Sequence, residues 1–547
     1  MSLTGLYQIG KSALIASQTA LAVTSNNIAN VNTPGYSEES VTLQIATPSS
    51  TSVGPVGNGV FATGVARSYD SYINAQLLNE QQKQRMSASL DQTWGQVEQV
   101  LNESQGIGLS GPLSNFFNDW NAVATDPDSP AARTQLLQDA NTFVQSAQSI
   151  ESSIDDTVKN ANATITSDAQ QVNSLASDIA TLNQQIIQSQ AGTQSNDLLQ
   201  DQRDAKLTAL AKLVDFTSYT DQNGALTVVV GNQNLVSGNQ TSQMTTGTDA
   251  NGNTTVILDG TDITSNIQGG DIGGLIQSRN DIQTKTLAGL NLLVASIAQQ
   301  VNTVHSQGYG LDGSTGNNFF TLAVPTVNNS AAATITPPNV TGPAALTTDT
   351  YTIAFNTSGP TTYNITDNQT GAVVASAAYT SGSPISFNGL SFTITGAVTN
   401  TDSFTIGSPL PTAISDLSVA ITDPNQVAAA STAAGVPGDN GNASQIAQLA
   451  NATIGSLGNQ TFSGYYSDVV AAVGSTKQAT SDSLTFNNNL LSQLQASRDS
   501  VSSVSLDTEA TNLITFQRSY EAAAKVINVA DELVQTVISL VGGSVTG

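Results

Sequence analysis

The sequence contains no cysteine and only one histidine among its 547 residues. Without cysteine, the chain can form no disulfide, no zinc site with thiolate ligands and no thiol nucleophile. The one histidine, His305, could serve a Ser-His-Asp triad only beside a nucleophile loop, and the chain has no Gly-x-Ser-x-Gly segment. We therefore expect a protein that is not an enzyme, with no catalytic residue, no cofactor and no metal.

Charged residues are also scarce, at 10% of the chain against about 25% in an average protein. Among them, 41 acidic residues outnumber 15 basic ones, which gives a formal net charge of −26. A chain this acidic repels phosphate backbones. It has no basic amphipathic stretch for an anionic membrane surface and no run of 18 consecutive apolar residues. We expect neither nucleic acid nor membrane as a partner.

Residues 3–31 carry apolar or small side chains at alternating spacings of four and three, which predicts an amphipathic helix. The positions of this stripe are Leu3, Tyr7, Gly10, Leu14, Ser17, Leu21, Thr24, Ile28 and Val31. Because several of these side chains are small or hydroxylic, the stripe could approach a second helix closely but would be weak alone.

The first helix is expected to end in the segment NNIANVNTPGYS, residues 26–37. Pro34 biases the residue before it towards extended backbone, and Gly35 can take the positive φ of a tight turn. Asparagine side chains hydrogen-bond nearby backbone at such corners. The residues expected to fix this corner between the helix and a following strand are Asn26, Asn27, Asn30, Asn32 and Tyr36.

The other end of the chain, residues 506–541, has the most regular pattern, a strict three-four spacing over four heptads. Such a stripe predicts a coiled-coil helix. Its expected interface residues are Leu513, Phe516, Tyr520, Ala523, Ile527, Ala530, Val534 and Val537. We expect it to pair with the first helix. A pair with so many small residues would be marginal in water, so we expect it to be mobile in the monomer and ordered on assembly.

The interior predicts an α+β multidomain protein, with long helical segments at the ends and in the body and inserted all-β modules. The expected divisions are an N-terminal axial helix and corner (1–70), a first helical body (71–215), a small β module (216–271), a second helical body (272–323), an outer β-domain (324–411), a helical return (412–505) and a C-terminal axial helix (506–547). The outer β-domain has no Lys, Arg or Glu and only three Asp. Alternation in YTIAF and LSFTIT predicts a small sandwich or barrel there.

Three local patterns imitate ligand or catalytic sites. GYGLDG at 308–313 has the letters of a dinucleotide loop but follows a predicted helix, so it predicts a turn. The segment 249–253 lacks the later glycine and glutamate of a calcium loop. The acid pair Asp155 and Asp156 lies on a helix face, which favours solvated carboxylates over a glycan-cleaving pair.

Both ends of the chain resemble one family. NNIANVNTPGYS at 26–37 resembles the N-terminal signature of bacterial flagellar rod, hook and hook-associated proteins, and residues 505–540 are similar to their C-terminal helix. Two interior segments, LLQDQRDAKLTALAKLVD at 198–215 and the stretch 273–320, resemble the members that join hook to filament. The double match at opposite ends makes the resemblance specific.

The resemblance implies a non-enzymatic structural subunit of the extracellular flagellum, assembled axially as the hook–filament junction through its paired terminal helices. It also implies type III export without a cleaved signal peptide, in keeping with an N-terminus whose first basic residue, Lys11, precedes no long apolar run. The implied partners are the hook protein, a second junction protein on the filament side, further copies of the chain in a ring or short helical segment, and an export chaperone. The alternatives are another axial protein (hook, distal rod or second junction protein) or an acidic secreted adhesin or enzyme whose β-domain binds a glycan.

Overall fold

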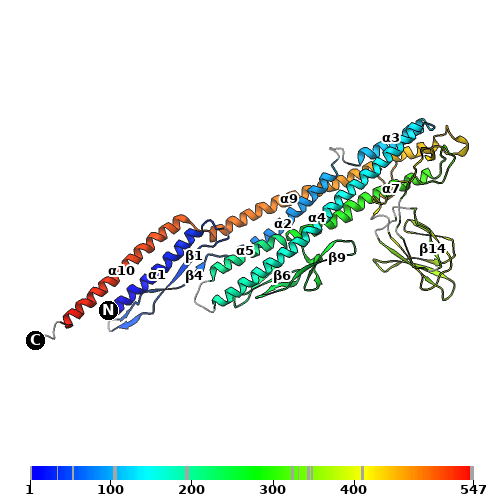
Figure 1. Ribbon diagram of the computed structural model, residues 1–547. Helices are drawn as coiled ribbons and strands as arrows, with labels where there is room; N and C mark the ends of the chain where they lie inside the picture. Colours follow the sequence, from blue (N-terminus) through cyan, green and yellow to red (C-terminus); the bar gives the residue numbers. More distant parts are fainter. Residues whose placement is uncertain are drawn as a thin grey trace. The chain divides into compact units, whose positions relative to one another are not determined.

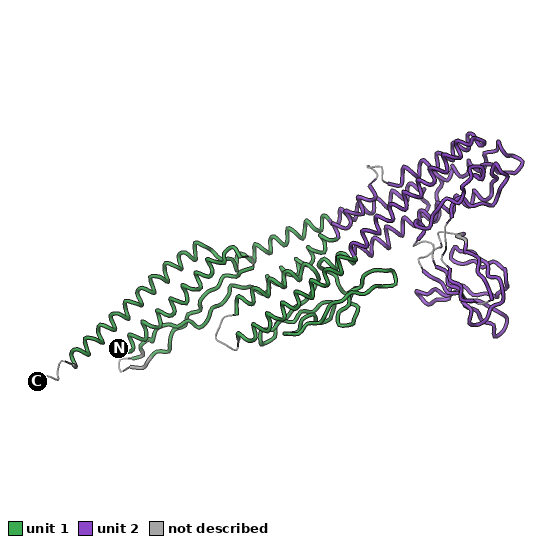
Figure 2. The backbone as a smooth tube through the Cα atoms, in the orientation of Figure 1, with its two compact units in different colours: residues 1–89, 162–276, 481–547 green, residues 90–161, 277–480 purple. Residues whose placement is uncertain are grey.

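The computed structural model describes residues 3–33, 35–51, 54–102, 108–190, 196–321, 324, 326–330, 332–341, 345, 349–407 and 412–542. The chain forms two compact units, coloured separately in Figure 2. Unit 1 comprises Met1–Ser89, Asn162–Ile276 and Ser481–Gly547, and unit 2 comprises Leu90–Ala161 and Gln277–Thr480. Each unit is therefore built from segments far apart in the sequence.

Helices dominate the described chain (Figure 1). The α-helices are α1 (Leu3–Asn30), α2 (Ser71–Val100), α3 (Ser110–Thr125), α4 (Pro130–Gln190), α5 (Asp197–Leu213), α6 (Gly270–Asp281), α7 (Ala288–His305), α8 (Gly441–Gln448), α9 (Phe462–Ser502) and α10 (Leu506–Gly542). A π-helical turn, η3 (Ile282–Leu287), joins α6 to α7. Short 3-10 turns are η2 (Thr264–Asn266), η6 (Pro424–Gln426), η7 (Ala433–Gly435), η8 (Leu449–Asn451) and η9 (Gly455–Leu457).

The strands form small antiparallel sheets. Those of unit 1 are β1 (Glu39–Ile45), β2 (Ser49–Thr51), β3 (Gly54–Val56), β4 (Val60–Arg67), β5 (Thr217–Thr220), β6 (Leu226–Val230), β7 (Gln233–Ser237), β8 (Gln240–Thr241), β9 (Met244–Thr248), β10 (Thr254–Leu258) and β11 (Thr261–Asp262). Those of unit 2 are β12 (Phe320–Thr321), β13 (Thr326–Asn328), β14 (Thr334–Ile335), β15 (Asn339–Val340), β16 (Tyr351–Asn356), β17 (Thr362–Asp367), β18 (Val373–Ala378), β19 (Pro384–Phe387), β20 (Leu390–Thr395), β21 (Ser403–Ile406) and β22 (Ser418–Val419).

Asparagines on α4 attach two of the small sheets of unit 1, β5-β6-β7-β8 and β11-β10-β9, to this helix. Asn183 is fully buried, donates to the carbonyls of Leu226 (2.8 Å) and Gly238 (2.7 Å), and accepts from the Leu226 amide (3.0 Å). Asn173 exchanges two hydrogen bonds with the backbone of Met244, at 2.7 and 2.8 Å. A side-chain amide can satisfy both groups of a strand residue at once. Asn173 and Asn183, two polar residues of the long helix α4, therefore anchor strands to it by hydrogen bonds.

Unit 2 has a core dense in aromatic rings. Phe116, Trp120, Phe143, Phe319 and Phe320 are all fully buried and stack or meet edge to face, with ring centroids 4.9–6.4 Å apart. Such pairs add to the free energy gained from burying their area. The cluster joins α3, α4 and the segment after α7.

His305 belongs to this core. It is 1% exposed, its Nδ1 lies 2.7 Å from the Asn317 carbonyl, and its Nε2 accepts from the Ala428 amide at 3.0 Å. Burial lowers the pKa of His305 to about 4, so the ring is neutral and bridges two loops. The neighbouring segment 308–313 forms a turn in which the Gly313 amide donates to the Gly310 carbonyl (3.1 Å), and Gly313 has φ of +79°.

The stretch Gly270–His305 is long and apolar enough to cross a membrane by length and composition, and 56% of its most apolar window is buried inside the protein. Its residues Leu293, Val294 and Ile297 are fully buried in the core of unit 2. We therefore assign it as a core helix.

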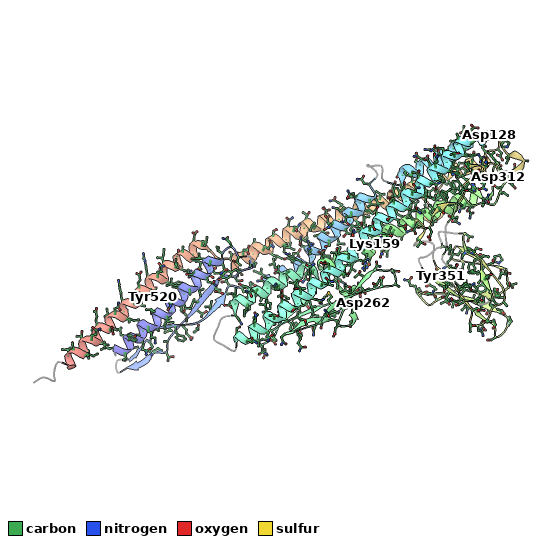
Figure 3. All side chains as sticks on the ribbon, viewed as in Figure 1. Asp128, Lys159, Asp262, Asp312, Tyr351 and Tyr520 are labelled. Atoms are coloured by element: carbon green, nitrogen blue, oxygen red, sulfur yellow. The ribbon has the colours of Figure 1, made fainter. Side chains whose placement is uncertain are left out.

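The outer β-domain consists of two sheets over one core. One has the order β13-β21-β16-β17-β18, and in the other β14, β15 and β19 all pair with β20. Burial alternates along β16 and β20, and the inward residues Ile353, Phe404, Phe392 and Ile394 belong to one cluster. Tyr351, labelled in Figure 3, closes the same core. Of the two expected forms, the described residues take the sandwich.

Candidate assembly interface

The first and last helices pair with each other, as predicted, and the structure shows that they run antiparallel. Gly10 of α1 lies against Ile527 of α10, while Glu38, just after the corner, donates its amide to the Ser502 carbonyl before α10 at 2.8 Å. In Figure 1 the two helices run side by side. Residues near position 10 therefore face residues near 527, and residues near the corner face the beginning of α10.

Small side chains line the contact between these helices. The buried residues of α1 are Gly10, Ala16, Ser17, Ala20, Thr24 and Asn27, and those of α10 with the same burial include Ala523 and Ala530. A Cβ added at Gly10 would lie 2.8 Å from Ile527 Cγ1 and 3.3 Å from Val526 Cγ1, closer than side chains tolerate. Gly10 thus sets the distance between the helices.

The predicted interface residues divide into two groups. Leu3, Leu14, Leu21, Ile28, Leu513, Phe516 and Ile527 are half-buried, and Ala523 and Ala530 are buried. Tyr7 (47%), Tyr520 (37%), Val534 (37%) and Val537 (45%) are exposed; Tyr520 is labelled on α10 in Figure 3. Since Gly10 faces Ile527, the antiparallel offset carries α10 beyond the first described residue of α1 soon after Val534. The last turns of α10 have no α1 residue to cover them.

The corner is built around Asn27, which is 1% exposed. Its Nδ2 donates to the Glu39 carbonyl (2.8 Å), and its Oδ1 accepts from the Glu39 amide (3.0 Å) and from the Tyr36 hydroxyl (2.8 Å). The Asn27 side chain thereby binds both backbone groups of Glu39, as a neighbouring strand would do. Burial, with Glu39 nearby, raises the pKa of Tyr36, so its hydroxyl remains a donor.

The other predicted corner residues have smaller roles. Asn26 donates to the Tyr36 hydroxyl and to Glu39 Oε2, both at 3.2 Å, and Asn30 donates to Asn26 Oδ1 at 3.0 Å. Gly35 has φ of +84°, as the predicted turn requires. Asn32 is exposed, and its side chain makes no hydrogen bond to the described residues of the corner. Pro34 lies outside the described residues.

A carboxylate far away in sequence fastens the corner to α5. Asp201 accepts from the Ser37 amide (2.9 Å) and hydroxyl (3.1 Å), and from Arg67 Nη1 at 2.7 Å. Arg67 also binds Asp204 at 2.8 Å and lies 3.9 Å from the centre of the Tyr69 ring. Burial disfavours the Arg67 charge, but Asp204 and Asp201 more than offset this and raise its pKa. Charge-assisted bonds of this kind are among the stronger ones.

Two glutamates meet where the corner touches α10. Glu509 is 2% exposed, and Glu38 lies close enough for the two side chains to share a hydrogen bond. Burial, and then the charge of Glu509, raises the pKa of Glu38. Arg498 of α9 donates to the Tyr36 carbonyl nearby, at 3.3 Å. The joint between α9 and α10 is thus tied to the corner by both backbone and side-chain contacts.

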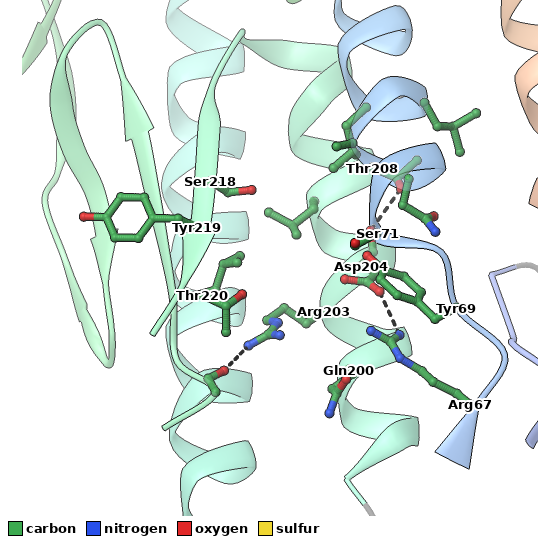
Figure 4. A pocket seen from close by; sticks show the side chains of 17 residues that line it. Arg67, Tyr69, Ser71, Gln200, Arg203, Asp204, Thr208, Ser218, Tyr219 and Thr220 are labelled. Carbon is green, nitrogen blue, oxygen red and sulfur yellow. Dashed lines mark hydrogen bonds and ion pairs between the residues drawn. The ribbon is translucent and has the colours of Figure 1, made fainter. Parts of the chain in front are cut away.

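A cavity of about 410 Å³ lies beside the corner, between the start of α2, α5 and strands β5 and β6 (Figure 4). Arg67, Arg203 and Asp204 form part of its wall. Arg67 is directed at Asp204, and Arg203 donates to the Gly224 carbonyl (2.8 Å) and to Asn183 Oδ1 (2.9 Å). These groups brace unit 1. Across the described residues, no group of three or more His, Asp or Glu is placed to hold a metal ion.

The sequence pattern identified the asparagines and Tyr36 but missed Asp201, Arg67, Arg498 and Ser502. Their partners lie far away in sequence, 164 residues in the case of Asp201 and Ser37, so no local spacing could reveal them. The one available signal was the segment 198–215, which contains Asp201 and was recognised by resemblance alone.

Three family models match the chain: the flagellar hook-associated protein FlgK helical domain at residues 94–320, the flagella basal body rod protein at 8–36, and the flagellar basal body rod FlgEFG protein C-terminal at 495–540. The last two cover the corner and α10. Flagellar hook-associated protein 1 of Salmonella typhimurium is 30% identical over 98% of this chain and 100% of its own length. Its counterpart in Escherichia coli is 29% identical over the same shares.

The fold is also found among solved structures. The flagellar hook junction protein FlgK from Burkholderia pseudomallei aligns with a TM-score of 0.60 and 20% identity, over 78% of this chain and 100% of that one. This likeness concerns the fold alone, and it shows the same α+β arrangement of long helices with inserted β modules.

Proposed function

The chain belongs to the flagellar hook-associated protein 1 family, and from this premise we propose that it is a structural subunit of the junction between flagellar hook and filament. The curated relatives match over 98% of the chain, so the assignment concerns the whole protein. The observation that carries the mechanism is the α1–α10 pair, which packs closely along its seam and leaves several large apolar side chains exposed.

Large apolar side chains of α10 are exposed to water. The most exposed are Leu506 (52%), Ile514 (52%), Val529 (50%), Ile538 (64%) and Leu540 (73%). On α1, Tyr7 and Ile15 are about half exposed, at 47% and 49%. So many exposed apolar side chains on one helix pair are typical of an interaction surface. They support axial packing in which neighbouring subunits cover the helix pair.

Coupling between folding and assembly follows from the same geometry. A two-helix pair with Gly, Ala, Ser and Thr in its seam buries little apolar area, so it gains only part of its stability within one chain. We propose that contacts with neighbouring copies, with the hook protein and with a second junction protein supply the rest. The corner centred on Asn27 would then fix the angle at which β1 leaves the packed helix α1.

The proposal includes a role without catalysis and a location outside the cell. The lone histidine is a neutral core residue, and the relatives are structural proteins by name. Export through the flagellar type III apparatus, without a cleaved signal peptide and with help from a chaperone, accords with the family. The acidic adhesin alternative has no feature of the described structure in its favour.

Imaging of cells that lack this chain tests the function. We expect complete hooks with no filaments attached, and filaments restored when the chain is expressed again. If the hooks themselves are absent, the protein acts earlier in assembly and the junction proposal is wrong. If filaments form normally, the chain is not required at the junction.

A further inference from the structure

The five-stranded sheet of the outer β-domain ends in a strand that is open on one side. Among the described residues, β18 pairs with β17 alone. Because the Tyr379 amide donates inward to the Thr361 carbonyl (2.8 Å), the antiparallel alternation directs the amides of Ser376 and Ala378 outward. Val373 is 57% exposed and Val374 38%. This edge offers both backbone hydrogen bonds and apolar side chains.

Free edges in monomeric proteins are normally protected by lysine, proline, a bulge or short length. The sequence of β18, VVASAA, has no charge and no proline. One register shift lies near its beginning, opposite Ile365 and Thr366, and leaves Ala375–Ala378 regular. The edge strand β19 of the second sheet differs, since it begins with Pro384 and buries Ile385 and Phe387. Beyond the register shift, Ala375–Ala378 of β18 have no such protection among the described residues of the β-domain.

The opposite end of the same sheet is the short strand β13, which pairs with β21. Its three residues are exposed, and Val327 is 56% exposed. Each strand in this sheet is antiparallel to its neighbour, so β13 and β18 run in the same direction. Among the described residues, β13 and β18 each have a neighbouring strand on one side only. Two such edges on opposite sides of a sheet can continue it from one copy to the next, head to tail.

Charge indicates that the occupant is a second copy of this chain. The chain carries −26 in total, and its segment 324–411 holds only three Asp and no Lys, Arg or Glu, so −3 lies here and −23 elsewhere. Identical copies of an acidic chain repel one another wherever their charged faces meet. A nearly neutral β-domain is the part of the molecule where two copies can approach at the least electrostatic cost.

We propose that, in the assembled junction, β18 of one copy pairs with β13 of the next copy, so that the five-stranded sheets continue from subunit to subunit. This inference rests on the proposed function, because it requires copies held side by side. Closed rings are built from head-to-tail contacts of this kind. Neighbouring copies in a ring of many subunits are related by a small rotation. Because β13 and β18 run in the same direction within one copy, β18 of one copy and β13 of the next would pair in parallel. Strand addition of this type takes its affinity from main-chain hydrogen bonds.

A double variant, Thr326→Cys with Ser376→Cys, tests the contact, since the natural chain has no cysteine. Four strand spacings, about 19 Å, separate the two positions within one copy, which exceeds the reach of a disulfide. Flagella are isolated from cells whose sole copy is this variant, oxidised mildly and run on a non-reducing gel. We expect a ladder of multiples of the 56.2 kDa chain that collapses on reduction.

The matched control is Thr326→Cys with Ser386→Cys, which moves one cysteine to an exposed position on the protected edge β19. We expect its ladder to be at least tenfold weaker. Adding Val373→Lys to the test variant should weaken the ladder by a similar factor while filaments still form. Since that variant keeps both cysteines in place, a weaker ladder would report on the strand edge and not on the position of the thiols.

Several outcomes would overturn the inference. Ladders of equal yield in test and control variants would mean random collision, and a single dimer formed by Ser376→Cys alone would mean twofold pairing of β18 with itself. A link to a different flagellar protein would assign the edge to another partner. Motile cells with no ladder would refute the sheet contact and leave the junction function intact. Failure of the function itself is distinguishable, because normal filaments would then form without the chain.

Discussion

The aromatic core of unit 2 and the terminal helix pair of unit 1 bury their helices in opposite ways. In unit 2, Phe116, Trp120 and Phe143 are completely enclosed by side chains of the same chain. In the pair α1–α10, the enclosed positions are Gly, Ala, Ser and Thr together with Asn27 and Glu509, while Ile538 and Leu540 remain 64% and 73% exposed. One region is complete within the monomer, and the other has large apolar side chains that no described residue of this chain covers.

This difference teaches where stability and assembly are located. Burying large apolar side chains stabilises a fold in proportion to the area removed from water. Unit 2 obtains this area from its own residues and can remain rigid as a single molecule. The helix pair places its largest side chains outward, so most of the area it can bury becomes available only beside other subunits. Substitutions in the two regions should therefore have different consequences.

The largest expected effect on stability is that of Trp120→Ala in unit 2. Removing a fully buried indole leaves a cavity among rings that meet at 5.4–6.4 Å, and we expect a loss of about 3–5 kcal/mol in the free energy of unfolding. Chemical denaturation measures it. The control is Tyr72→Ala, which removes a ring that is 70% exposed and should change stability by less than about 0.5 kcal/mol. Equal effects would mean that this core is not the stable centre.

Gly10→Val should instead abolish assembly. The added side chain would meet Ile527 and Val526 and separate the two helices, while unit 2 is untouched. We expect cells with hooks but few or no filaments and a purified protein whose main unfolding midpoint is unchanged. Gly57→Val is the matched control, since an added Cβ there meets nothing within 4 Å. Normal filament formation by Gly10→Val would contradict the close packing of α1 on α10.

Asn27→Ala tests the corner with a smaller effect. It leaves the Glu39 amide and the Tyr36 hydroxyl without their buried acceptor, which costs about 1–3 kcal/mol. We expect faster hydrogen exchange at the Glu39 amide and reduced, not absent, filament formation. The exposed Asn32→Ala serves as control and should behave as the natural chain. Equal exchange rates of the Glu39 amide in both variants would mean that Asn27 does not stabilise the corner.

The smallest expected effect concerns pH and Glu38. Burial and the charge of Glu509 raise the pKa of Glu38, so folding favours its protonated form. Its contribution is complete below the unfolded pKa of about 4.3 and is lost as the pH rises through the folded value. Glu38→Gln should remove this loss and protect the start of α10 from hydrogen exchange at neutral pH. Exposed Glu521→Gln should change nothing. Weaker protection in Glu38→Gln would contradict the sign.

Much of the helical framework could be predicted, because it depends on local periodicity. The helical body predicted over 71–215 contains α2, α3, α4 and α5, and the helix predicted over 506–541 corresponds to Leu506–Gly542. The second helical body, predicted over 272–323, contains a π-helical turn at Ile282–Leu287, which no spacing rule indicated. The alternation in β16 and β20 likewise produced their inward and outward faces.

The interface was less accessible to prediction, for two physical reasons. A heptad stripe indicates which face of a helix is apolar but not how far the opposite helix extends. Val534 and Val537 are therefore exposed, because α10 extends past the first residue of α1. Long-range polar contacts, such as Asp201 with Ser37 and Arg67, depend on tertiary structure and leave no local pattern. Asn26, Asn27 and Asn30 could be identified because their bonds stay within the corner, at most 13 residues along the chain.

Removal of α10 tests most directly the claim that the terminal helices serve assembly and not the stability of the body. A chain that stops at Ser505 would be examined by calorimetry and by its ability to attach filaments to hooks. We predict the same main unfolding transition as the complete chain and no filament attachment. Global unfolding of the shortened chain, or filaments that still attach to hooks, would contradict the claim.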